Sequence, residues 1–136
     1  MMKDSVYFDN FPEMGQMKLA INILDDGFPI LFCLKNGEKL YLTVYRAVYT
    51  HSIWTMSEIE EDTLIDMAEG RISVAEAFQS PGKDAWRIHA KRVDGQLVWE
   101  HEKLKAVDLE SVDLPDDDLF LDEDDREYIM DQLKSR

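Results

Sequence analysis

How this chain folds is decided by residues 86–102, which read WRIHAKRVDGQLVWEHE. Apolar and polar side chains alternate on both sides of Asp94-Gly95, a dipeptide that favours a two-residue type I′ turn. A turn at this point places Ala90 opposite Trp99 on one face of a two-stranded ribbon. The stretch therefore predicts an antiparallel hairpin with one apolar face.

The other face of this ribbon supports the same register through its charges. It places His89 opposite Glu100 and Arg87 opposite Glu102. Opposite charges directly across an antiparallel pair contribute roughly 0.2–1 kcal/mol each. Because the apolar pattern and the charges select one register, we expect a well-defined hairpin.

A second hairpin is predicted earlier in the chain, around Asn36-Gly37, which is also a strong turn signal. A two-residue turn with Asn36 and Gly37 at its centre pairs Cys33 with Leu40. Both faces of this hairpin are substantially apolar, so we expect it near the middle of a curled sheet. Together with a preceding alternating segment, the pattern predicts strands over residues 19–24, 30–34 and 40–45.

Three helical segments are expected. Ser57 followed by Glu60 matches a capping box and predicts a central helix over residues 58–69, ended by Gly70. Ser73 caps a short helical turn, and Asp122 caps a C-terminal helix. The fold class we expect is α+β, a curled and mostly antiparallel sheet of five or six strands with these helices beside it.

The charge is distributed unevenly along the 136 residues, which carry a net charge of −14. Residues 108–136 hold 12 acidic and 3 basic side chains, so most of the excess lies in the last fifth of the chain. We interpret residues 1–113 as a single α+β domain with an irregular N-terminal segment. Residues 114–136 are interpreted as an acidic C-terminal extension with a helix.

Composition excludes several classes of protein. No segment approaches the roughly 18 apolar residues of a membrane-spanning helix, and residues 1–10 lack the apolar core of a secretory signal peptide. The one cysteine, Cys33, cannot form an internal disulfide and is typical of a reducing compartment. The acidic balance also argues against direct binding of nucleic acid, so we expect a cytoplasmic protein without a membrane partner.

Catalytic and metal-binding signatures are absent from the sequence. The predicted register points His89 and His101 to opposite faces, and no zinc spacing is present. Calcium loops starting at Asp116 or Asp122 lack the required glycine. Cys33 is expected to be an inert strand residue, because burial raises the pKa of a thiol. We therefore predict no cofactor and no metal.

Two groups of residues are candidates for binding. The first is the acidic cluster, where a basic partner protein would bind: Asp116, Asp117, Asp118, Asp122, Glu123, Asp124 and Asp125. The second is a ligand pocket assembled from scattered polar and aromatic side chains: Arg46, His51, Trp54, Arg87 and His89.

A series of structural residues resembles a known pattern. Asp26-Gly27-x-Pro29 leads into an apolar strand, and Trp54 precedes a segment reading GRISVAEAF over residues 70–78. A Trp-bearing hairpin and Leu114-Pro115 with acidic residues follow. Over roughly residues 20–120 the chain resembles a family of small uncharacterised bacterial domains, found in bacterial and mobile-element genomes. The resemblance implies a bacterial cytosolic protein and carries over no activity and no functional residues.

The leading functional hypothesis is a non-enzymatic, acidic protein-interaction domain. One sharper alternative is a nucleic-acid mimic that blocks a DNA-binding protein, which needs carboxylates spread over a rigid surface. Another alternative is an enzyme or small-ligand binder whose site combines the five scattered residues. A pocket that gathers several of them would favour this last alternative.

Overall fold

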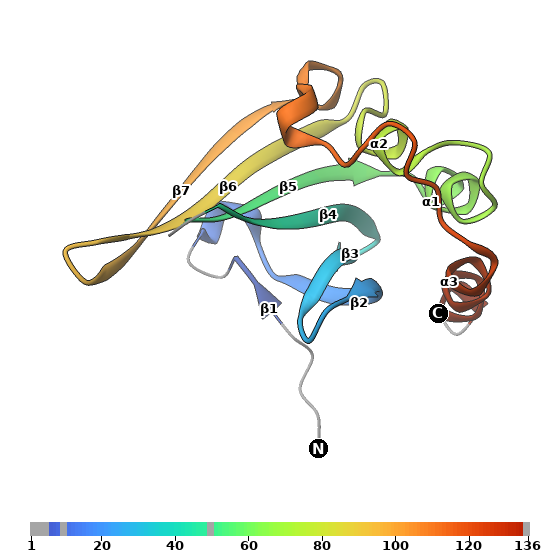
Figure 1. Cartoon of the computed structure of the whole chain (residues 1–136), viewed down its shortest axis with the longest axis horizontal. Coiled ribbons are helices and arrows are strands. Elements are labelled where there is room, and N and C mark those ends of the chain that lie inside the picture. Colours follow the sequence, from blue (N-terminus) through green and yellow to red (C-terminus); the bar gives the residue numbers. More distant parts are fainter. Residues whose placement is uncertain (1–5, 9–10, 49–50, 135–136) are drawn as a thin grey trace.

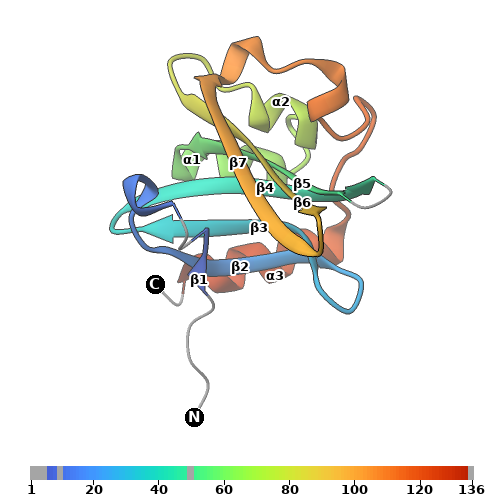
Figure 2. The same cartoon turned by 90° about the vertical axis from the view of Figure 1, so that its left-hand side faces the viewer.

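The computed structural model describes residues 6–8, 11–48 and 51–134. It shows an α+β fold in which one antiparallel sheet takes its strands in chain order and curls without closing into a barrel (Figures 1 and 2). Six long strands follow the two-residue β1. The strands are β1 (Val6–Tyr7), β2 (Met17–Asp25), β3 (Pro29–Asn36), β4 (Lys39–Val48), β5 (His51–Ile59), β6 (Asp84–Val93) and β7 (Gln96–Lys105).

The helices lie between β5 and β6 and after β7. Figure 1 shows them on one side of the sheet, with α3 beside α1. None of the helices in the described residues is both long and apolar enough to cross a bilayer. They are α1 (Glu61–Ala68), α2 (Val74–Phe78) and α3 (Glu123–Lys134), with short 3-10 turns η1 (Pro12–Met14), η2 (Ala106–Asp108) and η3 (Ser111–Asp113).

Each face of the sheet buries its own apolar cluster. The helix-covered face packs side chains such as Leu31, Cys33 and Leu42 against residues of α1, α2 and α3. The aromatic face packs Phe32 and Met56 against the segment that precedes β2. Because both clusters use alternate residues of the same strands, the sheet is covered on both sides.

The segment before β2 covers the aromatic face. Phe8, Phe11 and Met14 are buried there, and the ring of Phe11 lies 4.4 Å from that of His101 in β7. The carboxylate of Glu13 lies 2.5 Å from Nε2 of His101. The N-terminal aromatic residues therefore fold back onto the sheet, which links the two edges of the sheet across its curl.

The hairpin of β6 and β7 confirms the predicted register. Ala90 pairs with Trp99, His89 with Glu100, and the other predicted pairs follow. Asp94 and Gly95 have φ angles of +51° and +78°. Positive φ at both central positions is the requirement of a type I′ turn, which is why Asp-Gly suits this position.

The predicted register of the β3–β4 hairpin is wrong by two residues. Cys33 pairs with Leu42, and Asn36 pairs with Lys39, so the turn has Gly37 and Glu38 at its centre. Gly37 has a φ of +63°, whereas Glu38 is not among the residues with positive φ. This pattern fits a type II′ turn, which needs glycine at the first central position. A shift of two leaves every side chain on its predicted face.

The predicted start of the central helix is wrong. Ser57 lies in β5, where it pairs with Leu42 and Ala85, and α1 begins at Glu61 with Glu60 as its N-cap. Burial between two neighbouring strands outweighs the local capping pattern at Ser57. The predicted end is confirmed, because Gly70 has a φ of +76° directly after the helix.

The other two predicted caps are confirmed. Ser73 and Glu76 form a capping box at α2, with the Glu76 N–H donating to Ser73 Oγ at 3.1 Å. The Asp125 N–H donates to Asp122 Oδ1 at 2.9 Å at the start of α3. Ile129 of α3 is fully buried, and the helix packs against α1 and β2.

The two Ser-x-x-Glu motifs provide a matched test of this assignment. Replacing Ser73 by Ala should lower the free energy of unfolding by about 1 kcal/mol, because an N-cap hydrogen bond is lost. Replacing Ser57 by Ala should cost less, since its buried hydroxyl has no hydrogen-bond partner in the described structure. Urea denaturation of both variants measures the difference, and equal losses would contradict the assignment.

Candidate functional site

The chain after β7, residues 106–134, which contains most of the acidic extension and is called the C-terminal segment, is held against the rest of the fold. The Ala106 N–H donates to the Lys83 carbonyl at 2.9 Å, and the Val74 N–H of α2 donates to the Leu119 carbonyl at 3.0 Å. Gln79 adds a side-chain hydrogen bond to a backbone carbonyl of the segment. Its buried apolar residues are Ala106, Leu109, Leu121 and Ile129.

An ion pair fixes the middle of the segment to the sheet. Arg87 of β6 donates from Nε and from one terminal nitrogen to the two oxygens of Asp113, each at 2.9 Å. The backbone N–H of Glu110 also donates to Asp113, at 2.9 Å. Such bidentate, charge-assisted contacts are among the stronger hydrogen bonds in proteins.

The protonation of this pair follows from its surroundings. Burial raises the pKa of Asp113, but the hydrogen bonds from Arg87 and Glu110 and the charges of Arg87 and Arg46 outweigh it. The pKa of Asp113 therefore lies below its ordinary value. The hydrogen bonds from Arg87 to Asp113 raise the pKa of the guanidinium, so both groups stay charged.

The exposed side chains of residues 107–134 combine carboxylates with apolar side chains and also include two cations, Arg126 and Lys134. Of the seven large apolar side chains that are exposed in the described residues, four lie here. We call these residues together the acidic surface. Its apolar members are Val107, Val112, Phe120 and Tyr128, and its exposed carboxylates are Asp108, Glu110, Asp116, Asp117, Asp118, Asp122, Glu123, Asp124, Glu127 and Asp131.

The seven acidic residues singled out from the sequence all belong to this region. Asp116, Asp117 and Asp118 are exposed before the entry to α3, and six of the seven are exposed in total. Asp125 is half-buried in the first turn of α3. Burial raises the pKa of Asp125, and the charges of Asp122 and Asp124 raise it further.

Four of the five residues of the predicted ligand pocket share one face of the sheet. Strand pairing places Arg46, His51, Arg87 and His89 on the helix-covered side of the sheet, whereas Trp54 lies on the aromatic face. Arg87 is engaged by Asp113, and the charge of Arg46 acts on the same carboxylate. A groove at Trp54 includes none of the other four.

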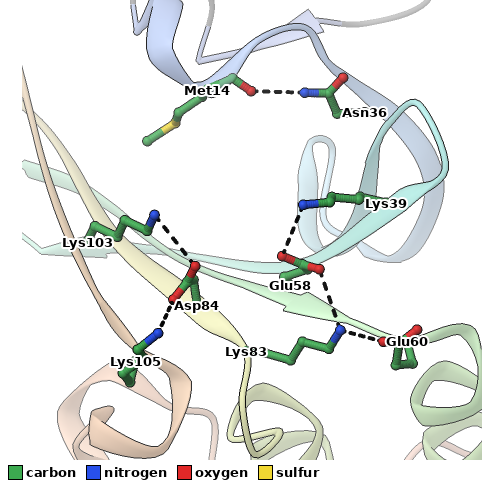
Figure 3. A network of polar contacts seen from close by, with 9 residues as sticks. All are labelled: Met14, Asn36, Lys39, Glu58, Glu60, Lys83, Asp84, Lys103 and Lys105. Carbon is green, nitrogen blue, oxygen red and sulfur yellow. Dashed lines mark hydrogen bonds and ion pairs between the residues drawn. The ribbon is translucent and has the colours of Figure 1, made fainter.

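A lysine–carboxylate network at the rim of the aromatic face was missed by the sequence analysis (Figure 3). Glu58 contacts Lys39 at 3.9 Å and Lys83 at 3.5 Å. Lys83 also contacts Glu60. One of the remaining pairs could have been found by extending the predicted β6–β7 register, which places Asp84 opposite Lys105.

The other half of the network lies beside Trp86. Asp84 contacts Lys105 at 3.0 Å and Lys103 at 3.5 Å, and Lys103 Nζ lies 5.7 Å from the centre of the Trp86 ring. Burial raises the pKa of the nearby Tyr41, as do the charges of Glu58 and Asp84. Each carboxylate of the network contacts at least one lysine. The charges of the network therefore largely cancel, and the network stabilises the rim of the sheet.

Within the part of the chain that the structure describes, no three His, Cys, Asp or Glu side chains gather at a point that would hold a metal ion. His89 and His101 lie on opposite faces, as their predicted register requires.

The Arg87–Asp113 contact makes a testable contribution to stability. Replacing Asp113 by Asn should lower the free energy of unfolding by roughly 1.5–3 kcal/mol, the range for hydrogen bonds to charged groups. Replacing Glu102 by Gln, which removes the more exposed partner of Arg87, should cost less than about 1 kcal/mol. Denaturant titrations of both variants at neutral pH measure the difference.

The same contact sets a pH dependence. Because the pKa of Asp113 is lowered in the folded state, its contribution is present above the unfolded value of about 3.9 and is lost as the pH falls through the folded value. Wild-type protein should therefore lose stability below about pH 4 more steeply than the Asp113→Asn variant. Parallel curves for the two proteins would contradict this role.

Comparison of the chain with models of protein families, with curated proteins and with solved structures finds no match.

Proposed function

We propose that this chain is a non-enzymatic protein-interaction domain that binds a partner with a basic surface through the acidic surface. The partner is a protein whose Lys and Arg side chains surround an apolar patch. The resemblance noted in the sequence adds the bacterial cytosol as the expected location of this interaction.

The observation that carries the proposal is the mixture of exposed side chains on an anchored segment. Phe120 and Tyr128 are 49% and 43% exposed, although a single-sign acidic tail needs no apolar residues to stay soluble. Protein interfaces combine aromatic anchors with a polar rim. The buried Leu121 and Ile129 fix the backbone beside these anchors, so little ordering entropy opposes binding.

The charge of the acidic surface supports a basic partner. Residues 108–136 carry a net charge of −9, which attracts positive surfaces and repels nucleic acid. The nucleic-acid mimic remains a second candidate, because these carboxylates lie on an ordered segment. The exposed aromatic rings favour the broader proposal, since a phosphate mimic needs charge alone.

The test compares two double variants of the full chain. Phe120→Ser with Tyr128→Ser removes the two aromatic anchors from the acidic surface. Val93→Ser with Leu97→Ser removes two equally exposed apolar side chains from the tip of the β6–β7 hairpin. Immobilised wild-type and variant proteins are exposed to lysate of the source cells, and the captured proteins are quantified by mass spectrometry.

We expect a basic protein that wild type and the hairpin variant capture and that the acidic-surface variant loses by at least about tenfold, the effect of one 1.4 kcal/mol contact. Binding of that purified protein should weaken steeply between low and physiological salt. A partner that all three proteins capture equally would contradict the proposal, as would a partner lost only by the hairpin variant.

A further inference from the structure

A small groove among side chains of the aromatic face is independent of the acidic surface. The β2–β3 turn carries Phe28 to its edge, where the ring is 49% exposed. The volume of the groove is about 200 Å³, enough for one compact side-chain-sized group. It is lined by Tyr7, Phe28, Pro29, Tyr45, Ser52 and Trp54.

The exposed ring of Phe28 is carried by a structured turn. The Gly27 N–H donates to Asp25 Oδ1 at 2.9 Å, and the Asp26 N–H donates to the Phe28 carbonyl at 3.0 Å. Gly27 adopts a φ of +79°, which other residues rarely take. The backbone of Phe28 is therefore fixed while half of its ring remains accessible.

Three rings surround the groove in different orientations. The Phe28 and Tyr45 rings lie 5.4 Å apart and nearly perpendicular, at 85°. Tyr45 and Trp54 lie 5.2 Å apart with an angle of 47°. These rings contact one another, and one face of Trp54 is stacked on Trp99 at 5.4 Å. A group in the groove therefore lies against the accessible sides of the rings, and the face of an aromatic ring attracts a cation.

The surroundings of the groove carry negative charge. Burial raises the pKa of the Tyr7 phenol, and the charge of nearby Asp25 raises it further. Asp26, two residues before Phe28 in sequence, is exposed. None of the lining residues that the structure describes is charged. A cation would therefore meet aromatic rings inside the groove and an attractive field from its rim.

We propose that this groove binds a quaternary ammonium group, held by the rings of Phe28, Tyr45 and Trp54.

The hydrogen-bonding capacity of the groove favours a fully alkylated cation over a lysine or arginine side chain. The hydroxyl groups of Tyr45 and Ser52 lie 3.2 Å apart and bond to each other. A primary ammonium or a guanidinium group brings three to five N–H donors, and the side-chain acceptors among the lining residues are the hydroxyl oxygens of Tyr7, Tyr45 and Ser52. A quaternary ammonium group has no N–H donor, so it leaves no hydrogen bond unmade when it moves from water to the rings.

The experiment compares choline with its uncharged isostere, 3,3-dimethylbutan-1-ol, on the full chain. Both probes have the same shape, but only choline carries a charge. We expect choline to shift the NMR signal of the Trp54 indole N–H and to bind roughly two- to fivefold more tightly than the isostere, the effect of an exposed cation–π contact. Equal affinities, or no choline-dependent shift at Trp54, would overturn the proposal.

A pair of matched variants locates the binding. Phe28→Leu keeps an apolar side chain at an exposed position but removes the ring, and it should weaken choline binding about two- to fivefold while leaving the isostere unaffected. Phe120→Leu removes an equally exposed ring from the acidic surface and should leave choline binding unchanged. Unaltered choline affinity in Phe28→Leu, or a loss in Phe120→Leu, would count against the groove.

Discussion

The need to keep water from both faces of one open sheet governs this structure. Central strands such as β3 and β4 carry apolar side chains on alternate faces, so neither face can be left to solvent. Helices α1, α2 and α3 cover one face (Figure 2), and the segment that contains η1 covers the other. Both faces are therefore largely occupied by the fold's own side chains.

Sequence reasoning predicted the class of fold because its signals were local and redundant. The register at Asp94-Gly95 was supported by turn chemistry, apolar alternation and charge at once, and all of it is confirmed. At Asn36-Gly37 only the turn signal set the register, and Gly37 takes the first central position instead of the second. Ser57 shows a second limit of prediction from local sequence. Its pairing with Leu42 and Ala85, which are distant in sequence, places it in a strand.

The candidate sites show the same difference between local signals and contacts distant in sequence. Composition alone identified the acidic cluster, since contiguous carboxylates stay together in any fold. The ring pair of Phe28 and Tyr45 and the contact of Arg87 with Asp113 join residues more than fifteen positions apart, and no local pattern specifies such neighbours. Of the five scattered pocket residues, which were grouped by chemical type, four share the helix-covered side of the sheet, and Trp54 lies on the aromatic face.

The aromatic segment before β2 has a consequence for the order of assembly. Phe11 precedes β2 in the chain, yet its ring contacts Trp99 and His101 in β7, the last strand to be synthesised. Contacts between residues so far apart in sequence form slowly, because ordering the long intervening loop costs conformational entropy. The contacts of Phe11 with β7 therefore form only after that strand has been translated, whereas Tyr7 can already pack on Phe32 of β3.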